Sequence, residues 1–147
     1  MEQIIRIKKL EEGARVPTYG SELAAGADLY ALLGGDLTIA PGKTEMVRTG
    51  ISMEIPEGYA GLIFARSGLA AKRNLAPANK VGVIDADYRG EILVALHNHG
   101  DEPQTLTPGE RIAQMVITPF LKGLFTEADD LAVTERGEKG FGSTGRA

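Results

Sequence analysis

Turn-forming residues recur at short intervals along this chain, and their spacing limits how long any regular element can be. Gly, Pro, Asp and Asn cluster at residues 34–36, 41–42, 56–58, 87–90, 98–101 and 108–109. The segments between these clusters are short and alternate apolar with polar residues, as half-buried strands do. Many short strands joined by frequent turns favour an all-β fold, so we predict a jelly-roll-like β-barrel or sandwich.

Three segments carry the strand pattern most clearly. Ile51, Met53 and Ile55 point to one face of a predicted strand, and polar residues occupy the other face. Residues 92–97 and 111–120 are apolar on both faces, so we expect both faces of these two strands to be covered.

Helix signals are weak. The best candidates are one or two turns over residues 68–73, directly after Ser67, and the acidic segment 127–131. The predicted fold class is therefore all-β with one short helix.

Length and composition exclude several classes of protein. A chain of 147 residues matches one domain, and the absence of cysteine excludes disulfides, thiolate metal sites and cysteine nucleophiles. With 16 basic and 20 acidic residues, the net charge of -4 argues against general binding of nucleic acid. Arg6, Lys8 and Lys9 interrupt the apolar N-terminal residues, and no apolar run approaches the roughly 18 residues that cross a bilayer. We expect a cytoplasmic protein with no membrane and no nucleic acid as partner.

The last fourteen residues, 134–147, differ in kind from the rest of the chain. They contain four glycines within ten residues, Phe141 as the single aromatic residue, and basic residues that include Arg136. Because such a segment cannot fill a core, we divide the chain into a β domain, residues 1–133, and a C-terminal arm, residues 134–147. The arm is either a frayed tail or a flexible glycine-rich arm that binds a phosphate. It is not a P-loop, because Ser143 stands where the Walker A pattern requires Lys.

Two segments place charged residues among small or apolar ones. Asp28 stands alone in AGADLYA (25–31), and by itself it is explained by a strand edge or a turn. Arg66, Ser67 and Gly68 put a guanidinium, a hydroxyl and a backbone N–H side by side before the possible helix. This combination suits an anion, and it equally suits a serine N-cap beside a surface arginine.

Asp85 ends an apolar run over residues 82–84, and strand alternation predicts that Asp87 lies on the same side. A carboxylate on a buried strand needs a compensating role, such as binding a metal, taking a proton or accepting hydrogen bonds from the turn at 87–90.

Two further features lie on predicted strands. Gln114 interrupts the apolar segment GERIAQMVI (109–117), and a buried amide needs hydrogen-bond partners from the backbone or a ligand. His97 and His99 are two residues apart and could share a metal, but the sequence suggests no third ligand, so we interpret them as solvated strand or turn positions.

The order of these segments resembles that of the five motifs of the trimeric dUTPases. The matching segments are AGADLYA (25–31), RSGLA (66–70), NKVGVIDADYRGE (79–91), GERIAQMVI (109–117) and RGEKGFGSTG (136–145). Ala65 departs from the family, which usually has Gly or Pro there, and so do Glu138 and Lys139, where a small residue and Gly are more common. The resemblance implies a β jelly roll that hydrolyses dUTP to dUMP and pyrophosphate, which limits uracil in DNA and supplies dUMP for thymidylate synthesis.

The resemblance also implies roles for residues 79–88. Asp85 would orient and deprotonate the water that attacks the α-phosphorus. Tyr88 would lie against the deoxyribose, where a 2′-hydroxyl would clash. Uracil would be bound by the hairpin at Asn79, Gly82 and Val83.

Phosphate binding and the metal follow from the same resemblance. The phosphates would contact Arg66, Ser67, Gly68 and Gln114, and the arm would add Arg136, Gly142, Ser143 and Thr144. Phe141 would stack on the uracil. Mg²⁺ would be held mainly by phosphate oxygens and water, with Asp28 acting through a water. The family is a homotrimer whose sites are shared: one chain provides the Asp28 group, a second the Asp85 hairpin, and a third the arm.

Two other classes of protein fit parts of this pattern. A dCTP deaminase shares this fold but resembles a pattern with a second Ser after Arg-Ser and a nearby catalytic Arg, whereas here Gly68 follows and Lys72 is the nearest cation. A non-catalytic nucleotide-binding module would be expected to lack Asp85, Tyr88 or the arm, and all three are present.

Overall fold

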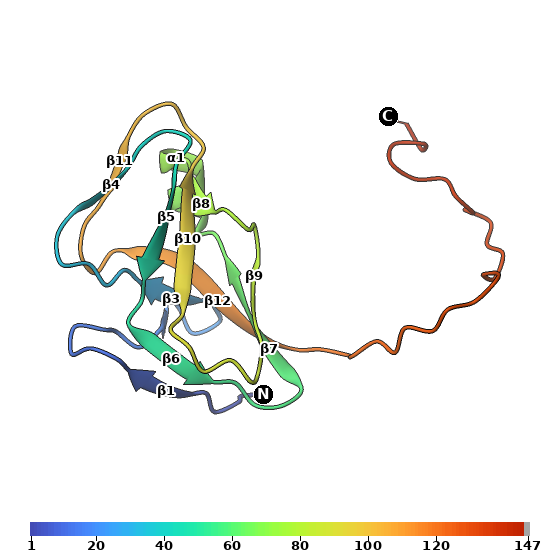
Figure 1. Cartoon of the computed structure of the whole chain (residues 1–147), viewed down its shortest axis with the longest axis horizontal. Helices are drawn as coiled ribbons and strands as arrows, with labels where there is room; N and C mark the ends of the chain where they lie inside the picture. Colours follow the sequence, from blue (N-terminus) through green and yellow to red (C-terminus); the bar gives the residue numbers. More distant parts are fainter. Residues whose placement is uncertain (146–147) are drawn as a thin grey trace.

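The computed structural model describes residues 1–145, so Arg146 and Ala147, at the end of the predicted arm, lie outside the described residues. Within that range the chain forms short strands and one seven-residue helix (Figure 1). The elements are β1 (Arg6–Lys9), β2 (Thr18–Tyr19), β3 (Ala27–Tyr30), β4 (Leu37–Ile39), β5 (Thr44–Arg48), β6 (Ile51–Glu54), β7 (Tyr59–Phe64), α1 (Ser67–Arg73), β8 (Leu75–Pro77), β9 (Gly82–Ile84), β10 (Leu93–Asn98), β11 (Gln104–Leu106) and β12 (Arg111–Pro119). The predicted all-β class with one short helix is confirmed.

The strands form one larger sheet and three smaller ones, all antiparallel. The larger sheet has the order β2-β3-β12-β7-β9, and the others are β5-β10-β8, β1-β6 and β11-β4. In Figure 1, β5 and β10 run vertically and cross β12 of the larger sheet. Among residues 1–145 these pairings do not close into one ring, so the fold is a set of packed antiparallel sheets rather than a closed barrel.

Alternation along the strands places apolar side chains in the core, as predicted. Ile51, Met53 and Ile55 are all buried, and so are Val94 and Leu96 on β10. These residues belong to a single cluster of buried side chains to which both the three-stranded and the five-stranded sheet contribute. The core therefore lies between these two sheets.

Within a single chain, residues 92–97 are fully covered on one face only, which differs from the prediction that both faces are covered; on the other face Ala95 and His97 are half-buried. Leu93 is 40% exposed, and Met46 on the neighbouring β5 is exposed as well. The three-stranded sheet packs on the core through one face, so side chains that alternate with Val94 and Leu96 point away from it. β12, which is central in its sheet, is buried or half-buried from Ile112 to Thr118, as expected.

Helix α1 begins directly after β7 and agrees with the prediction to within one residue. Its buried residue is Leu69, which joins the core. The helix ends at Asn74, whose left-handed backbone (φ 55°) lets its N–H donate to the Leu69 carbonyl. Lys72 and Arg73 lie in the last turn, where positive charge favours the helix dipole.

The second candidate helix, over residues 127–131, does not form. β12 ends at Pro119, and the chain then runs away from the body of the molecule (Figure 1). Leu121 and Phe125 are 98% and 99% exposed, so this segment packs against nothing within the described chain. Short helices depend on tertiary contacts for most of their stability, and residues 127–131 have none.

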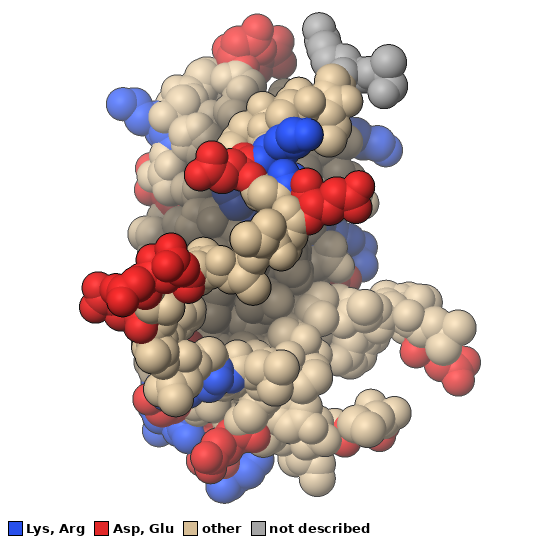
Figure 2. Space-filling model, turned by 90° about the vertical axis from the view of Figure 1, so that its right-hand side faces the viewer, with Lys and Arg blue, Asp and Glu red and all other residues tan. Residues whose placement is uncertain are grey.

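The face from which the C-terminal segment projects carries mixed charges. Figure 2 shows Lys and Arg scattered among Asp and Glu on this face rather than gathered into one basic field. No helix among residues 1–145 is long and apolar enough to cross a membrane.

Candidate active site

Asp28 lies in the middle of the larger sheet and is held by two arginines. Its strand β3 lies between β2 and β12, and the residue is only 8% exposed. Arg66 Nε donates to one carboxylate oxygen at 3.0 Å, and Arg111 Nη1 lies 3.4 Å from the other. A carboxylate this buried needs such partners. Asp28 is therefore a buried ion-pair residue rather than an isolated aspartate at a strand edge.

Gln114 lies next to this ion pair because β12 pairs with β3 in a register that sets it opposite Asp28. Its Nε2 donates to the backbone carbonyl of Ala65 at 2.9 Å, immediately before Arg66. A Cβ on Gly26 would come closer than 3.0 Å to Gln114 Oε1, so a side chain there would force this amide to move. The predicted need of Gln114 for a hydrogen-bond partner is met by the backbone.

Arg66 is the N-cap of α1, and Ser67 is its first helical residue. Arg66 has an extended backbone (φ −87°, ψ 132°), and no side chain caps the helix. The alternative of a serine N-cap beside a surface arginine is therefore wrong: Arg66 is half-buried and bound to Asp28. Ser67 and Gly68 are exposed directly beside it.

The structure thus brings together five of the residues predicted to contact substrate or metal, which are Asp28, Arg66, Ser67, Gly68 and Gln114. We call them the Asp28 cluster. With Arg111 included, two guanidinium groups face one carboxylate, which leaves net positive charge near the exposed hydroxyl and backbone of the helix start. Guanidinium groups with spare N–H donors are suited to bind phosphate oxygens.

Asp85 follows the last residue of β9 and is exposed. The premise that it ends a buried strand is wrong, because Val83 within that strand is 61% exposed. The neighbouring Asp87 does not continue the alternation either, since the strand stops at Ile84 and the Tyr88 N–H donates to the Asp85 carbonyl at 3.2 Å. A turn therefore separates the two carboxylates, and the Asp85 side chain is accessible to solvent.

Asn79 and Gly82 lie close together at the other end of β9. A Cβ on Gly82 would stand 3.3 Å from Asn79 Nδ2 and 3.4 Å from Ile63 Cβ, so the absence of a side chain lets Asn79 approach the strand. The backbone turns sharply between them: Lys80 has a φ of 65°, and the Val81 N–H donates to the Asn79 carbonyl. Asn79, Gly82 and Val83 thus lie in one segment with Asp85. The predicted β-hairpin is wrong as a strand pairing, because β8 pairs with β10 and β9 with β7. We keep the name Asp85 hairpin for residues 79–88.

Asp85 lies near the start of β7, whereas the Asp28 cluster lies at its end. Ile84 pairs with Gly61 near the start of that strand, whereas Arg66 follows its end. An extended chain covers roughly 16 Å between Gly61 and Arg66, at about 3.3 Å per residue. Within one chain, Asp85 therefore does not face the residues of the Asp28 cluster.

The predicted arm residues form a third group, which stands apart from the body (Figure 1). Arg136, Phe141, Gly142, Ser143 and Thr144 are all exposed. Their hydrogen bonds are local: Arg136 Nε donates to the Lys139 carbonyl at 2.7 Å, and the Ser143 N–H to the Gly140 carbonyl at 3.1 Å. Phe141 has a left-handed backbone with a φ of 51°, which is uncommon for an aromatic residue.

A model of the dUTPase family matches residues 12–145 of this chain. The chain belongs to the dUTPase family. A deoxyuridine 5'-triphosphate nucleotidohydrolase of Desulfitobacterium hafniense is 52% identical over 136 residues, which cover 92% of this chain and 90% of that protein.

Solved dUTPase structures share the fold of this family member. A mutant dUTPase of Staphylococcus bacteriophage 80alpha with dUpNHpp matches at a TM-score of 0.90 and 28% identity, over 99% of this chain and 100% of that one. A mutant dUTPase from phage phi11 of S. aureus, in which a structural Mg(II) ion is coordinated, matches at 0.80 and 22% identity, over 89% and 100%.

Three residues of this dUTPase-family chain support the site but were not predicted from the sequence. Arg111 binds Asp28, and Arg48 binds Glu91 just after the Asp85 hairpin. Arg111 and Glu91 lie inside two of the five motifs given above. Their partners Asp28 and Arg48 are 83 and 43 residues away in the sequence. Only the strand register brings such pairs together, so the local sequence carried no signal for them.

Asp28 fits a divalent cation only through water. Two guanidinium groups beside the carboxylate oppose direct binding of a dication, but a carboxylate has about four lone-pair sites and can still accept a hydrogen bond from a metal-bound water. No group of three His, Cys, Asp or Glu in residues 1–145 is placed to hold a metal. His97 and His99 have ring centroids 5.9 Å apart, and His97 Nδ1 lies 2.8 Å from Thr44 Oγ1.

Proposed function

We propose that this protein hydrolyses dUTP to dUMP and pyrophosphate. The observation that carries the proposal is the Asp28 cluster in a chain of the dUTPase family, where two arginines and an ordered amide surround an exposed helix start. The 52% identical relative acts on deoxyuridine 5'-triphosphate, and the phage 80alpha enzyme binds dUpNHpp. Both point to the same substrate for this chain.

Asp85 is the general base in this proposal. It orients a water toward the α-phosphorus and takes its proton, a step that typically contributes about 10²–10⁴-fold to the rate. Its exposed position after β9 leaves the carboxylate accessible to a water and a substrate. Tyr88 lies three residues further on, on the same turn, and closes the space that a 2′-hydroxyl would need.

The base and the phosphates are bound by different groups. Uracil binds the hairpin at Asn79, Gly82 and Val83, where the backbone bends sharply. The phosphates bind Arg66, Ser67, Gly68 and Gln114. The arm adds Arg136, Gly142, Ser143 and Thr144, and the exposed ring of Phe141 stacks on the uracil, which gains roughly 1–3 kcal/mol.

The protein acts as a homotrimer with shared sites. This part of the proposal is supported by the separation of the three groups in one chain: the Asp28 cluster and Asp85 lie at opposite ends of β7, and the arm leads away from both. Residues 134–147 span up to ~46 Å when extended, at about 3.3 Å per residue, which is enough to reach a neighbouring subunit. Three copies can therefore assemble a site that one copy cannot.

Mg²⁺ is the proposed cofactor, and when bound it neutralises charge on the triphosphate. Its direct ligands would be phosphate oxygens and water, and Asp28 would accept a hydrogen bond from one of those waters. The arginine pairs of Asp28 keep its carboxylate oriented for this role.

Product analysis tests the function directly. The protein is incubated with Mg²⁺ and each of dUTP, dCTP and UTP, and the nucleotides are resolved by ion-exchange chromatography. We expect dUMP and pyrophosphate from dUTP, and little reaction with the other two. Deamination of dCTP would identify a deaminase, and binding of dUTP without turnover would identify a non-catalytic module.

A further inference from the structure

Tyr88 is held in one orientation by the two residues that follow Arg89. A Cβ on Gly90 would come closer than 3.0 Å to the Tyr88 ring and its hydroxyl, so the ring lies directly over the Gly90 backbone. The Tyr88 hydroxyl donates to the Glu91 carbonyl at 2.8 Å. Tyr88 is nevertheless 41% exposed, so part of the ring remains available to a ligand.

The Glu91 side chain ties this loop to the body of the protein. Arg48, the last residue of β5, donates to both carboxylate oxygens, from Nε at 3.0 Å and from Nη2 at 3.1 Å. The Gly50 N–H adds a third hydrogen bond at 3.2 Å. The Arg48 guanidinium lowers the pKa of Glu91, with a smaller contribution from Gly50, so the carboxylate is charged at neutral pH.

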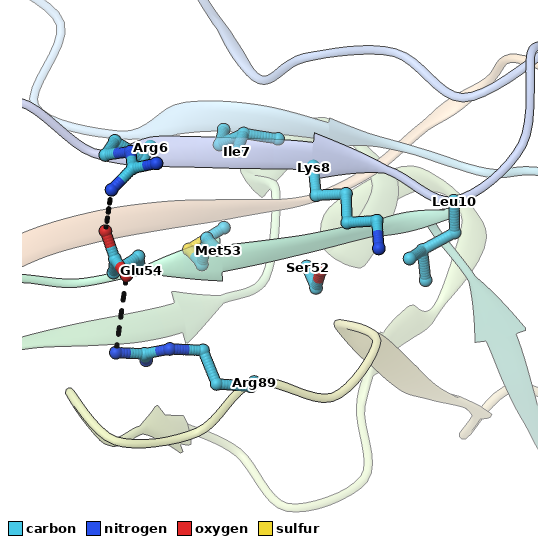
Figure 3. Close-up of a pocket in the computed structure, with 8 residues that line it drawn as sticks. All are labelled: Arg6, Ile7, Lys8, Leu10, Ser52, Met53, Glu54 and Arg89. Atoms are coloured by element: carbon cyan, nitrogen blue, oxygen red, sulfur yellow. Dashed lines mark hydrogen bonds and ion pairs between the residues drawn. The ribbon is translucent and has the colours of Figure 1, made fainter.

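Arg89 makes a second, looser connection on the opposite side of the loop. Its Nη1 donates to the Ala86 carbonyl at 2.6 Å, while its Nη2 lies 3.8 Å from Glu54 on β6 (Figure 3). Glu54 also binds Arg6 at 3.0 Å, and all three side chains are largely exposed. The Arg48–Glu91 pair, with its two-point geometry, is therefore the tighter connection between the loop and the strands.

We propose that Glu91 is a positioning residue for sugar selection. Its carboxylate fixes the loop to Arg48, and its backbone carbonyl fixes the Tyr88 hydroxyl, so the ion pair sets where the Tyr88 ring stands against the sugar. This inference rests on the proposed dUTP hydrolysis and on Tyr88 as the residue that excludes the 2′-hydroxyl.

The two nucleotides to be distinguished, dUTP and UTP, differ only by the 2′-hydroxyl. Rejecting one extra hydroxyl requires a rigid ring, yet residues 85–91 belong to no strand. The Arg48 side chain is 45% exposed and that of Glu91 18%, so the ion pair contributes modestly to stability. Its two parallel N–H···O bonds restrict orientation as well as distance. Loss of the Arg48–Glu91 pair is therefore expected to affect selectivity more than folding.

The test compares kcat/KM for dUTP and for UTP in Glu91→Gln, Arg48→Gln, Arg48→Lys and the double variant Arg48→Gln/Glu91→Gln. In each single Gln variant, we expect the ratio of kcat/KM for dUTP to kcat/KM for UTP to fall by about 5- to 10-fold. This is the change that loss of a charge-assisted hydrogen bond allows. The double variant should lower the ratio no further, because both changes remove one interaction. Arg48→Lys, which keeps the charge but not the two-point geometry, should fall in between.

Glu11→Gln is the matched control. Glu11 binds Arg48 Nη1 at 2.7 Å but does not contact the Tyr88 loop, so its loss should leave the preference within about twofold of the wild type. Circular dichroism confirms that the variants are folded, which we expect because the Arg48 side chain is 45% exposed. Tyr88→Ala gives the preference for dUTP over UTP when the Tyr88 ring is absent.

The outcomes are distinguishable. If Tyr88→Ala narrows the preference while folded Glu91→Gln and Arg48→Gln retain it, Glu91 has no positioning role and the inference is overturned. It is also overturned if Glu11→Gln narrows the preference as much as Glu91→Gln does. If the wild-type protein does not hydrolyse dUTP at all, the proposed function itself has failed, and this inference with it.

Discussion

The Asp28 cluster and the C-terminal arm are both proposed to bind phosphate, but the structure holds them in opposite ways. In the cluster, Arg66 is bound by a buried carboxylate, and Gln114 is fixed by a backbone carbonyl and by the space at Gly26. In the arm, the Arg136 side chain is bound, among residues 1–145, only to the carbonyl of Lys139, three residues away. The cluster is therefore formed before a ligand arrives, whereas the arm must be placed by binding.

The two regions therefore differ in the conformational entropy that each loses when a ligand binds. A preformed group loses little freedom when it binds, while the arm loses backbone entropy of about 1–2 kcal/mol for each residue that becomes ordered. Only contacts with substrate and a neighbouring subunit can offset this cost for the arm. Substitutions that disturb the contacts of the Asp28 cluster should therefore affect both folding and activity, whereas substitutions in the arm should affect activity alone.

The largest effect is expected from Asp85→Asn. The variant should bind dUTP but turn it over about 10²–10⁴-fold more slowly, because the amide cannot take the proton of the attacking water. Asp85 is exposed and makes no ion pair within residues 1–145, so the fold should be unaffected. Steady-state kinetics with a calorimetric binding measurement separates the two effects. Near-normal turnover would remove Asp85 from the role of base.

The second-largest effect on activity is expected from removal of the arm after Val133. We expect kcat/KM for dUTP to fall by at least about 10²-fold, since a closing segment that positions the substrate is lost. The melting temperature should not change, because residues 134–145 make hydrogen bonds only to one another within the described chain. A lower melting temperature would show that the arm is part of the folded body. It would contradict the difference drawn here between the arm and the Asp28 cluster.

Gly26→Ala should affect both folding and activity. The new Cβ collides with the Gln114 amide, which must leave Ala65, and we expect a loss of about 1–3 kcal/mol in unfolding free energy together with weaker substrate binding. Gly20→Ala is the control, since nothing lies within 4 Å of a Cβ there and no effect is expected. Denaturant unfolding of both variants gives the comparison, and equal stabilities would contradict it.

The smallest effect is a pH dependence of stability at Glu91. Its pKa in the folded protein is lowered from the ordinary value of 4.5, chiefly by hydrogen bonds from Arg48. The stabilisation is therefore fully present above pH 4.5 and is lost as the pH falls through the lowered folded value. The difference in unfolding free energy between wild type and Glu91→Gln should shrink below pH 4.5. A constant difference down to strongly acid pH would show that the ion pair does not stabilise the fold.

Short-range patterns in the sequence were sufficient to predict much of the fold. The alternation at Ile51, Met53 and Ile55 predicted a buried strand face, and the polar start at Ser67 predicted the helix. The helix over 127–131 was wrong because acidic composition does not reveal that the segment has no surface to pack on. The exposed face at Leu93 was missed for a similar reason, since an apolar residue does not reveal whether anything covers it.

The motifs predicted individual residues of the candidate site but not their arrangement, and the substrate contacts of these residues stay predictions. The motifs identified Asp28, Arg66 and Gln114, and the structure brings them together through the register of β3, β12 and β7. The ion pairs of Arg111 and Glu91 depend on that register and on loop positions, which alternation alone does not encode. The sequence also could not show that Asp85 lies at the far end of β7 from Arg66.

The central claim is that one active site combines the Asp85 hairpin of one subunit with the arm of another. The most direct measurement mixes two variants, Asp85→Asn with an intact arm and a chain cut after Val133 with Asp85 intact, and assays dUTP hydrolysis after equal amounts are refolded together. Each variant alone should be nearly inactive, and random mixing in a trimer should restore about a quarter of the sites. If mixed trimers form and activity stays at the level of the separate variants, hairpin and arm belong to the same subunit and the claim is contradicted.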